Sequence, residues 1–439
     1  METSLLPQTS LTKEQKEAVG LLSVGTFLEY FDLMLYVHMA VLLNELFFPK
    51  SDPFNTSLLS AFAFCSSYAL RPVGALIFGW IGDNIGRKTT VILTTAMMAL
   101  SCLAMSALPT YNQIGITASW IMILCRMAQG LSSMGEIVGA ELYITEITKP
   151  PTQYLAVGLV TLCSVVGGTV AIVLSLVCIS GFFNWRYAFL SGAFIAILGM
   201  TARAKLRETV EFVDAKKRMQ NAINELDESQ PTESEKILIE KIYNKKANIK
   251  TSLAYLYILS PWPAIFFFTY VHCGDILKNT FHYNAEQILK NNLYVSIFNA
   301  IFFGIIVLLT KKFHPLKILK TQAIIFLVVI LSFPYLLSHA SSALHIFWIQ
   351  LLLMLITIRS NPAAPIFYKR FPVFWRFRYA AFLYAISRLL IYIITSFGTV
   401  YLIKAFGYYG ILVIMLPIGL LFYHGIRHFE ELDLYEKNF

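Results

Sequence analysis

The feature that most constrains this chain is a series of apolar stretches, each about 20 residues long, that recurs along the whole sequence. A helix needs about 20 predominantly apolar residues to cross a hydrocarbon layer of roughly 30 Å. Hydrophobic residues make up 57% of the 439 residues and charged residues only 14%, which is too apolar for a large water-soluble globule. We therefore expect an all-α protein whose partner is the lipid bilayer.

Twelve such stretches can be distinguished, and a polar segment separates the first six from the last six. They lie at approximately 20–43, 57–81, 89–108, 115–139, 155–180, 186–202, 252–273, 291–310, 318–337, 342–367, 378–402 and 407–426. The expected organisation is an N-terminal segment (1–19), a six-helix bundle (20–202), a linker (203–250), a second six-helix bundle (251–427) and a tail (428–439).

The basic residues are distributed unevenly between the two sides of the expected membrane. With both termini inside, 26 of the 35 Lys and Arg fall in inside segments, five fall outside and four lie within helices. Because positive charge in loops concentrates on the cytoplasmic side, we expect cytoplasmic termini in a multi-pass protein of the cell membrane, with a bacterial inner membrane favoured. This orientation accounts for the net charge of +9, and no nucleic-acid partner is expected.

No metal site or cofactor is expected from the sequence. The six Cys fall in or beside apolar spans without C-x-x-C spacing, so they are interpreted as small core residues. His424 and His428 lie one helical turn apart, a spacing that can bind metal, but an interfacial role is favoured for them.

Two carboxylates interrupt the first apolar stretch. At about 100° per residue, Glu29, Asp32 and Tyr36 share one helix face, near the middle of the bilayer. A buried acid there costs at least about 2.5 kcal/mol unless it is paired or protonated, and it usually marks an ion or proton path. Proton coupling through Glu29 or Asp32 is one interpretation, and a permanent ion pair that fixes the first helix is the other.

Arginines occupy similarly deep positions in the second and fourth stretches. Arg71 is expected to need a carboxylate partner and to form a structural ion pair. Arg126, with Gln129 one turn later, can meet the acids of the first helix at the same depth. Such an arginine can neutralise an acid or bind a substrate carboxylate through two parallel hydrogen bonds. A fixed ion pair remains the alternative, and Glu136 is a third candidate for proton coupling.

A short charged turn joins the second and third stretches, with Asp83, Arg87 and Lys88 among glycines that include Gly79 and Gly86. Glycines allow two helix ends to approach closely, and the charges can tie them together. The turn is thus interpreted as a latch, whereas an ordinary positively charged loop is the alternative.

These segments together resemble the major facilitator superfamily. The pattern G-x-x-x-D-x-x-G-R-K resembles the loop between its second and third helices, where the resemblance implies a cytoplasmic gate, although Asn84 replaces the usual basic residue. The runs F-L-E-Y-F-D, R-P-x-G-x-x-x-F-G and R-x-x-Q-G-x-x-x-G-G-E, the last with Met134 in place of one glycine, are similar to the metabolite:proton symporter branch. This branch includes carriers of proline and betaine, citrate, oxoglutarate and shikimate. The resemblance implies twelve transmembrane helices in two six-helix bundles, moving by alternating access.

Two arginines in the second half, Arg359 and Arg388, stand where that branch is expected to have small or neutral residues. Charges this deep are expected to face the central cavity, where they would favour a substrate carboxylate. Pairing with acids elsewhere, or snorkelling of Arg359 to the inner surface, is the alternative. Tyr30 and Tyr36 are available for cation–π contact with a quaternary ammonium, and His38 could assist proton transfer from Asp32.

The expected function is secondary active import of a small carboxylate-bearing or zwitterionic metabolite by proton symport, by a monomer. A proton-independent facilitator or exporter of an organic anion, including a larger polycarboxylate, is the alternative. A non-transporting sensor or a membrane enzyme is more distant, because neither an H-E-x-x-H nor a G-x-S-x-G run occurs. An enzyme is therefore not expected.

Overall fold

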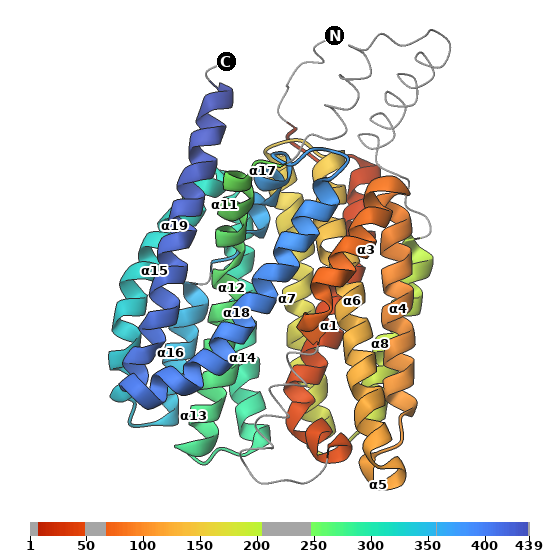
Figure 1. Cartoon of the computed structure of the whole chain (residues 1–439), viewed down its shortest axis with the longest axis vertical. Helices are drawn as coiled ribbons and strands as arrows, with labels where there is room; N and C mark the ends of the chain where they lie inside the picture. The colour runs from red at the N-terminus through yellow and green to blue at the C-terminus, as the bar shows by residue number, and fades with distance from the viewer. Residues whose placement is uncertain (1–7, 49–66, 204–246, 357, 438–439) are drawn as a thin grey trace.

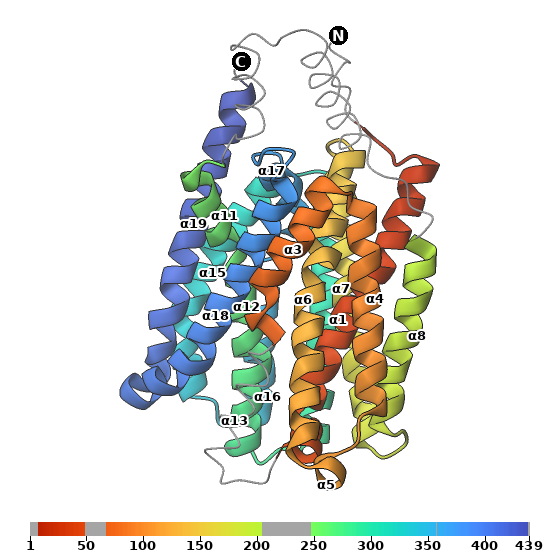
Figure 2. The same cartoon turned by 45° about the vertical axis from the view of Figure 1, so that its right-hand side comes forward.

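The computed structural model describes residues 8–48, 67–203, 247–356 and 358–437, apart from a few side chains within these ranges. Most of the expected linker, and the first part of the second apolar stretch, lie outside the described residues. Described helices account for each of the twelve expected spans, and they form two groups that stand side by side (Figures 1 and 2). This agrees with the all-α membrane fold expected from the sequence.

The first group contains the six spans of the N-terminal half. Its helices are α1 (Lys13–Phe47), α3 (Arg71–Asn84), α4 (Arg87–Ala107), the short α5 (Tyr111–Ile114), α6 (Ile116–Ile147), α7 (Thr152–Ile179) and α8 (Trp185–Arg203). Helix α6 continues beyond residue 139, where the fourth apolar stretch ends, to Ile147. The extension places two more acids, Glu141 and Glu146, in the same helix as Arg126.

The second group contains the C-terminal half, in which two spans are irregular. The seventh span is made of α11 (Ile249–Leu259), α12 (Pro261–Phe266), the π-helix η1 (Phe267–His272) and α13 (Cys273–Asn279). The others are α14 (Ala285–Leu309), α15 (Pro315–Ser338), α16 (Ala343–Leu355) with η2 (Asn361–Ala363) and α17 (Ala364–Tyr368), α18 (Arg376–Phe406), η3 (Gly407–Tyr409) and α19 (Gly410–Lys437). Seven helical stretches among the described residues are long and apolar enough to cross a membrane by length and composition.

The tenth span is broken rather than bent. Pro362 and Pro365 predict a bend, but α16 already ends at Leu355, and helical structure resumes only at Asn361. A proline lacks an N–H and restricts the residue before it, so helical structure is disfavoured ahead of each proline. The break leaves Arg359 in non-helical backbone between α16 and α17.

Helix α1 begins and α19 ends at the same end of the molecule, which we call the termini end (Figure 1). The two groups meet along α7 and α14 and along α3 and α18. Close approach of α3 to α18 depends on Gly79, because a Cβ at this position would lie 2.8 Å from Cα of Arg378. A larger residue would push the two helices apart.

Candidate functional site

A buried polar network connects α1, α4 and α6 inside the first group of helices. The thiol of Cys102 in α4 donates to Oδ1 of Asp32, with 3.0 Å between sulfur and oxygen. Nε2 of Gln129 lies 3.8 Å from the same sulfur, and Oε1 of Gln129 accepts from Nη1 of Arg126 at 2.7 Å. Arg126 and Gln129 can form this bond because residues three apart share one face of a helix. The network thus joins an acid to an arginine through two neutral side chains.

Arg126 stacks on an aromatic ring and keeps part of its hydrogen-bonding capacity. Its guanidinium carbon lies 3.9 Å from the centre of the Tyr36 ring, and the residue is only 1% exposed. Its Nε and Nη2, which form one edge of the guanidinium, have no hydrogen-bond partner among the described residues, nor has the Tyr36 hydroxyl. Buried donors are normally satisfied, so this edge is suited to an acceptor such as a carboxylate.

For Asp32, the ion pair expected with Arg126 takes the form of a hydrogen-bonded chain. Among the described residues, this chain runs from Arg126 through Gln129 and Cys102 to Asp32. Glu29 lies one turn before Asp32 in α1 and is also buried. Glu136 belongs to α6, but its side chain lies outside the described residues.

Arg71 does not show the expected carboxylate partner in the described part of the chain. Its guanidinium instead lies over the ring of Tyr68, 4.4 Å from the ring centre. A desolvated cation–π contact can stabilise a buried guanidinium by about 2 kcal/mol, so an aromatic face partly replaces the acid.

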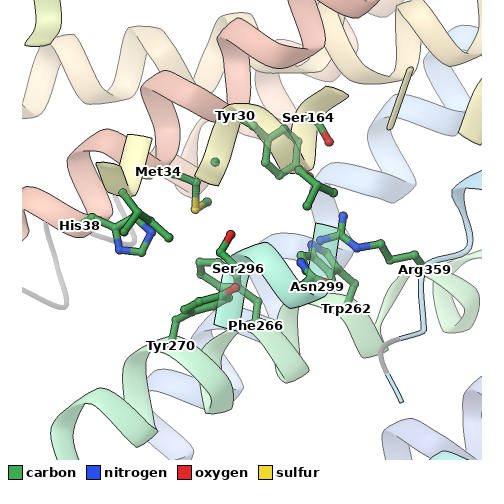
Figure 3. Close-up of a pocket in the computed structure, with 13 residues that line it drawn as sticks. Tyr30, Met34, His38, Ser164, Trp262, Phe266, Tyr270, Ser296, Asn299 and Arg359 are labelled. Carbon is green, nitrogen blue, oxygen red and sulfur yellow. The ribbon is translucent and has the colours of Figure 1, made fainter. Parts of the chain in front are cut away.

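A small cavity lies between the two groups of helices, on a different face of α1 from Asp32. Tyr30, Met34 and His38 line it from α1, at a spacing of one helical turn (Figure 3). Aromatic and polar side chains of α12, η1, α7 and α14 complete the wall, namely Trp262, Phe266, Tyr270, Ser164, Ser296 and Asn299, together with Arg359. His38 lies edge-on to Tyr270 with ring centres 6.1 Å apart, so it belongs to the cavity wall.

Arg359 reaches this cavity from the break between α16 and α17 (Figure 3). Its guanidinium carbon lies 3.5 Å from the Trp262 ring centre and 5.1 Å from that of Phe303. Its Nε has no hydrogen-bond partner in the described part of the molecule. The cavity therefore combines one buried cation with several aromatic faces.

Arg388 satisfies a carbonyl group that a proline leaves free. Its Nη1 donates to the carbonyl oxygen of Leu259 at 3.1 Å, and its Nη2 donates to the Tyr384 hydroxyl at 3.3 Å. In a regular helix the Leu259 carbonyl would accept from residue 263, but Pro263 has no N–H. Arg388 is thus tied to the wall of the second group.

The charged turn contacts the second group at the termini end. Oδ1 and Oδ2 of Asp83 accept from the backbone N–H groups of Phe377 and Arg378, at 3.3 and 3.0 Å. These N–H groups belong to the first turn of α18, whose dipole favours a negative charge there. Gly86 precedes α4 with a φ of 151°, and the side chain of Arg87 lies outside the described residues. Asp83 therefore connects the two groups at the termini end.

Further contacts between the groups at this end involve acids of the α6 extension. Glu141 accepts from Nδ2 of Asn361 at 2.6 Å and from the Tyr368 hydroxyl at 2.7 Å. Oε1 of Glu146 lies 3.6 Å from Nη1 of Arg376. The sequence does not reveal these partners of Glu141, because they are more than 200 positions away. Cys102 was likewise missed, since a lone Cys in an apolar span is typical of the core.

A model of the Major Facilitator Superfamily matches residues 22–368, well over half of the chain. The chain belongs to the Major Facilitator Superfamily. This membership places the chain in a family of multi-pass membrane transporters rather than of enzymes. Among the described residues, no group of three His, Cys, Asp or Glu could hold a metal ion.

Sequence relatives of this superfamily member include bacterial transporters. It is 32% identical over 209 residues to a putative proline/betaine transporter of Staphylococcus aureus (strain COL), covering 46% of this chain and 45% of the relative. It is 26% identical over 284 residues to a proline/betaine transporter of Escherichia coli (strain K12), covering 62% and 55%. The matches span about half the length of these curated relatives, and their names agree with the resemblance to the metabolite:proton symporter branch.

Solved structures show the same superfamily fold. The proton:xylose symporter XylE bound to 6-bromo-6-deoxy-D-glucose matches with a TM-score of 0.75 at 14% identity, covering 94% of this chain and 96% of that one. The human organic anion transporter MFSD10 matches with a TM-score of 0.67 at 12% identity, covering 95% and 100%. At these identities the likeness concerns the fold alone.

Proposed function

We propose that this chain imports a small carboxylate-bearing or zwitterionic metabolite together with protons, by alternating access. The observation that supports the proposal best is the network in which Arg126 has an unsatisfied edge and is joined to Asp32 through Gln129 and Cys102. An ionised Asp32 and a substrate carboxylate would compete for the positive charge of Arg126. Protonation of Asp32 would remove the competing negative charge, so the anion would bind more tightly when the proton is present.

The second part of the proposal concerns the cavity. Arg359 is a cation with an unsatisfied Nε, and Trp262, Phe266 and Tyr270 offer aromatic faces beside it. A zwitterion can place its carboxylate near the guanidinium and its ammonium over an aromatic ring. Tyr30 lines the same cavity, and we propose that it contacts the solute. Arg388 would act on the solute through its charge, because its own nitrogens already bond Leu259 and Tyr384.

We further propose that the termini end faces the cytoplasm and that the contacts there form the inner gate. The excess of Lys and Arg in the segments at this end supports the orientation. Gly79, Asp83, Gly86, Arg87 and Lys88 would form the first half of the gate, with the start of α18 opposite. The protein would work as a monomer in the cell membrane, with Glu29 and Glu136 as further candidate proton carriers beside Asp32.

Reconstituted vesicles test this function. The purified protein is placed in proteoliposomes with an inward proton gradient, and uptake of radiolabelled proline, betaine, citrate, oxoglutarate and shikimate is measured. One proton moving down 100 mV supplies about 2.3 kcal/mol, which is enough for roughly fiftyfold accumulation of a neutral solute. Accumulation that collapses when a protonophore is added supports symport.

The same experiment decides between the proposal and the alternative. Equilibration of a solute without accumulation, unchanged by the protonophore, would favour a proton-independent facilitator or exporter of an organic anion. An Asp32→Asn variant should still exchange labelled for unlabelled solute but lose gradient-driven accumulation. If it accumulates solute as well as the wild type, Asp32 does not carry the coupling proton.

A further inference from the structure

Glu141 is a buried residue whose carboxylate forms hydrogen bonds across the boundary between the two groups of helices. It lies in α6 of the first group and is 3% exposed. Its Oε1 accepts from Asn361 at 2.6 Å and from Thr161 of α7 at 3.3 Å, and its Oε2 accepts from Tyr368 at 2.7 Å. All three partners are neutral donors, so the carboxylate is held by hydrogen bonds rather than by a formal ion pair with any of them.

The two residues that Glu141 holds across the boundary belong to one short segment. Asn361 begins η2, and Tyr368 is the last residue of α17. The next residue, Lys369, donates to Oε1 of Gln153 in α7 at 3.0 Å. Segment 361–369 is therefore fastened to helices α6 and α7 of the first group, although it belongs by sequence to the second.

The other part of the same span is fastened to the second group. Gln350 of α16 donates to the carbonyl oxygen of Thr269 in η1 at 2.7 Å, and it accepts from Asn291 of α14 at 2.6 Å. The non-helical break between α16 and η2 thus separates a portion anchored to the second group from a portion that is also hydrogen-bonded to the first. Phe367 of this second portion still packs on Phe429 of α19, with ring centres 4.6 Å apart. Arg359 lies in this break, two residues before Asn361, with its guanidinium at the cavity.

We propose that Glu141 is a positioning residue that fastens α17 to the first group and thereby sets the position of Arg359 in the cavity. When the two groups separate at the termini end, one of two things must happen. Either the hydrogen bonds from Glu141 to Asn361 and Tyr368 are lost, or the non-helical segment that carries Arg359 is stretched. Glu141 therefore couples closure of this end to the geometry of the cation that faces the solute. The part that concerns the solute rests on the proposed function, whereas the fastening of α17 does not.

The fastening can be measured without any solute. Spin labels are attached to Ile85→Cys and Phe313→Cys, two exposed turn residues at the termini end of the first and second groups. Cys65 and Cys163 are first replaced by Ser, because the other four native Cys are buried. Double electron–electron resonance in lipid nanodiscs then measures the distance between the two labels. The distance distribution gives the populations of the closed and open forms.

In Glu141→Gln, one accepting oxygen becomes an NH₂ group that faces donors. The closed-to-open ratio is expected to fall between tenfold and hundredfold, the effect of losing a hydrogen bond to a charged group. Tyr368→Phe should cause a similar shift while retaining the packing, and the double variant should shift no further. Glu286→Gln, at an exposed acid paired with Lys290 within α14, is the matched control and should match the wild type.

A Glu141→Gln distribution identical to that of the wild type, or shifts that add in full in the double variant, would overturn the fastening. The positioning of Arg359 is read from thermal stabilisation by betaine and citrate. Glu141→Gln should weaken binding at least fivefold in the wild type but not in an Arg359→Gln background. Equal weakening in both backgrounds would refute the positioning role. Failure of both compounds to stabilise the wild type would count against the proposed substrate class, while the distance result would stand.

Discussion

The thiol of Cys102 in α4 donates a hydrogen bond to the carboxylate of Asp32 in α1, with 3.0 Å between Sγ and Oδ1. Both residues are almost completely buried, and the same sulfur is close to Gln129, the partner of Arg126. A donor at this position stabilises the ionised carboxylate relative to the protonated acid. Cys102 is therefore placed to influence when Asp32 takes up a proton.

Replacement of Cys102 by Ala is expected to shift the pH dependence of uptake upward. Without the donor, the charged form of Asp32 is less stable, so the proton is retained at higher pH. A loss of roughly 1.4 kcal/mol would move the midpoint by about one pH unit. Cys102→Ser keeps a donor and should stay within a few tenths of a unit of the wild type. Uptake profiles from pH 5 to 9 in proteoliposomes give the comparison, and equal midpoints for Ala and Ser would contradict it.

Replacement of Arg126 by Gln is expected to weaken solute binding by roughly tenfold to hundredfold, because a charge-assisted hydrogen bond contributes about 1.5–3 kcal/mol. Arg126→Lys should recover only part of this loss, since an ammonium does not present the planar edge formed by Nε and Nη2. Calorimetric titration with the solute identified by uptake measures the difference. Arg427→Gln, at an exposed position in α19, serves as the control. Full affinity in Arg126→Gln would exclude a binding role.

A pair of Gly→Ala variants tests the close approach of α3 and α18. At Gly79 the new Cβ would lie 2.8 Å from Cα of Arg378, so Gly79→Ala must separate the helices and is expected to cost about 1–3 kcal/mol. At Gly20 in α1 no atom lies within 4 Å of the new Cβ, and Gly20→Ala should be neutral or stabilising by up to about 1 kcal/mol. Thermal unfolding in detergent compares the two variants. Equal melting temperatures would show that α3 and α18 do not pack this closely.

The bond from Arg388 to the Leu259 carbonyl can be tested together with Pro263. Arg388→Ala should destabilise the protein by about 1–3 kcal/mol, because the carbonyl loses its donor. Pro263→Ala supplies the missing backbone N–H, so the same arginine substitution should cost less in that background. A double-mutant cycle on thermal stability gives the coupling, and strict additivity would show that Arg388 does not serve this carbonyl. Unchanged selectivity between a carboxylate solute and a neutral analogue in Arg388→Ala would further assign the residue a structural role.

Much of the architecture follows from local sequence properties. Apolar stretches of membrane-spanning length determine the helices, because backbone N–H and C=O groups in a bilayer must be satisfied within the segment. Deep charged residues such as Asp32, Arg126 and Arg359 stand out for the same reason, since each is costly unless it has a function or a partner. The fold and the candidate acids and arginines could therefore be predicted from the chain alone.

Only the tertiary structure decided which of these groups meet. Asn361 and Tyr368, which bond Glu141, are more than 200 residues away from it. Asp83 bonds the start of α18 across the boundary, and Arg388 bonds a carbonyl freed by Pro263. It also placed Cys102 between Asp32 and Gln129, where the sequence suggested only a core residue. Position along an apolar stretch determines how deep a residue lies, and helical periodicity determines which face it occupies. Hydrogen bonds at 3 Å depend on how the helices pack against one another, and that packing is a property of the whole chain.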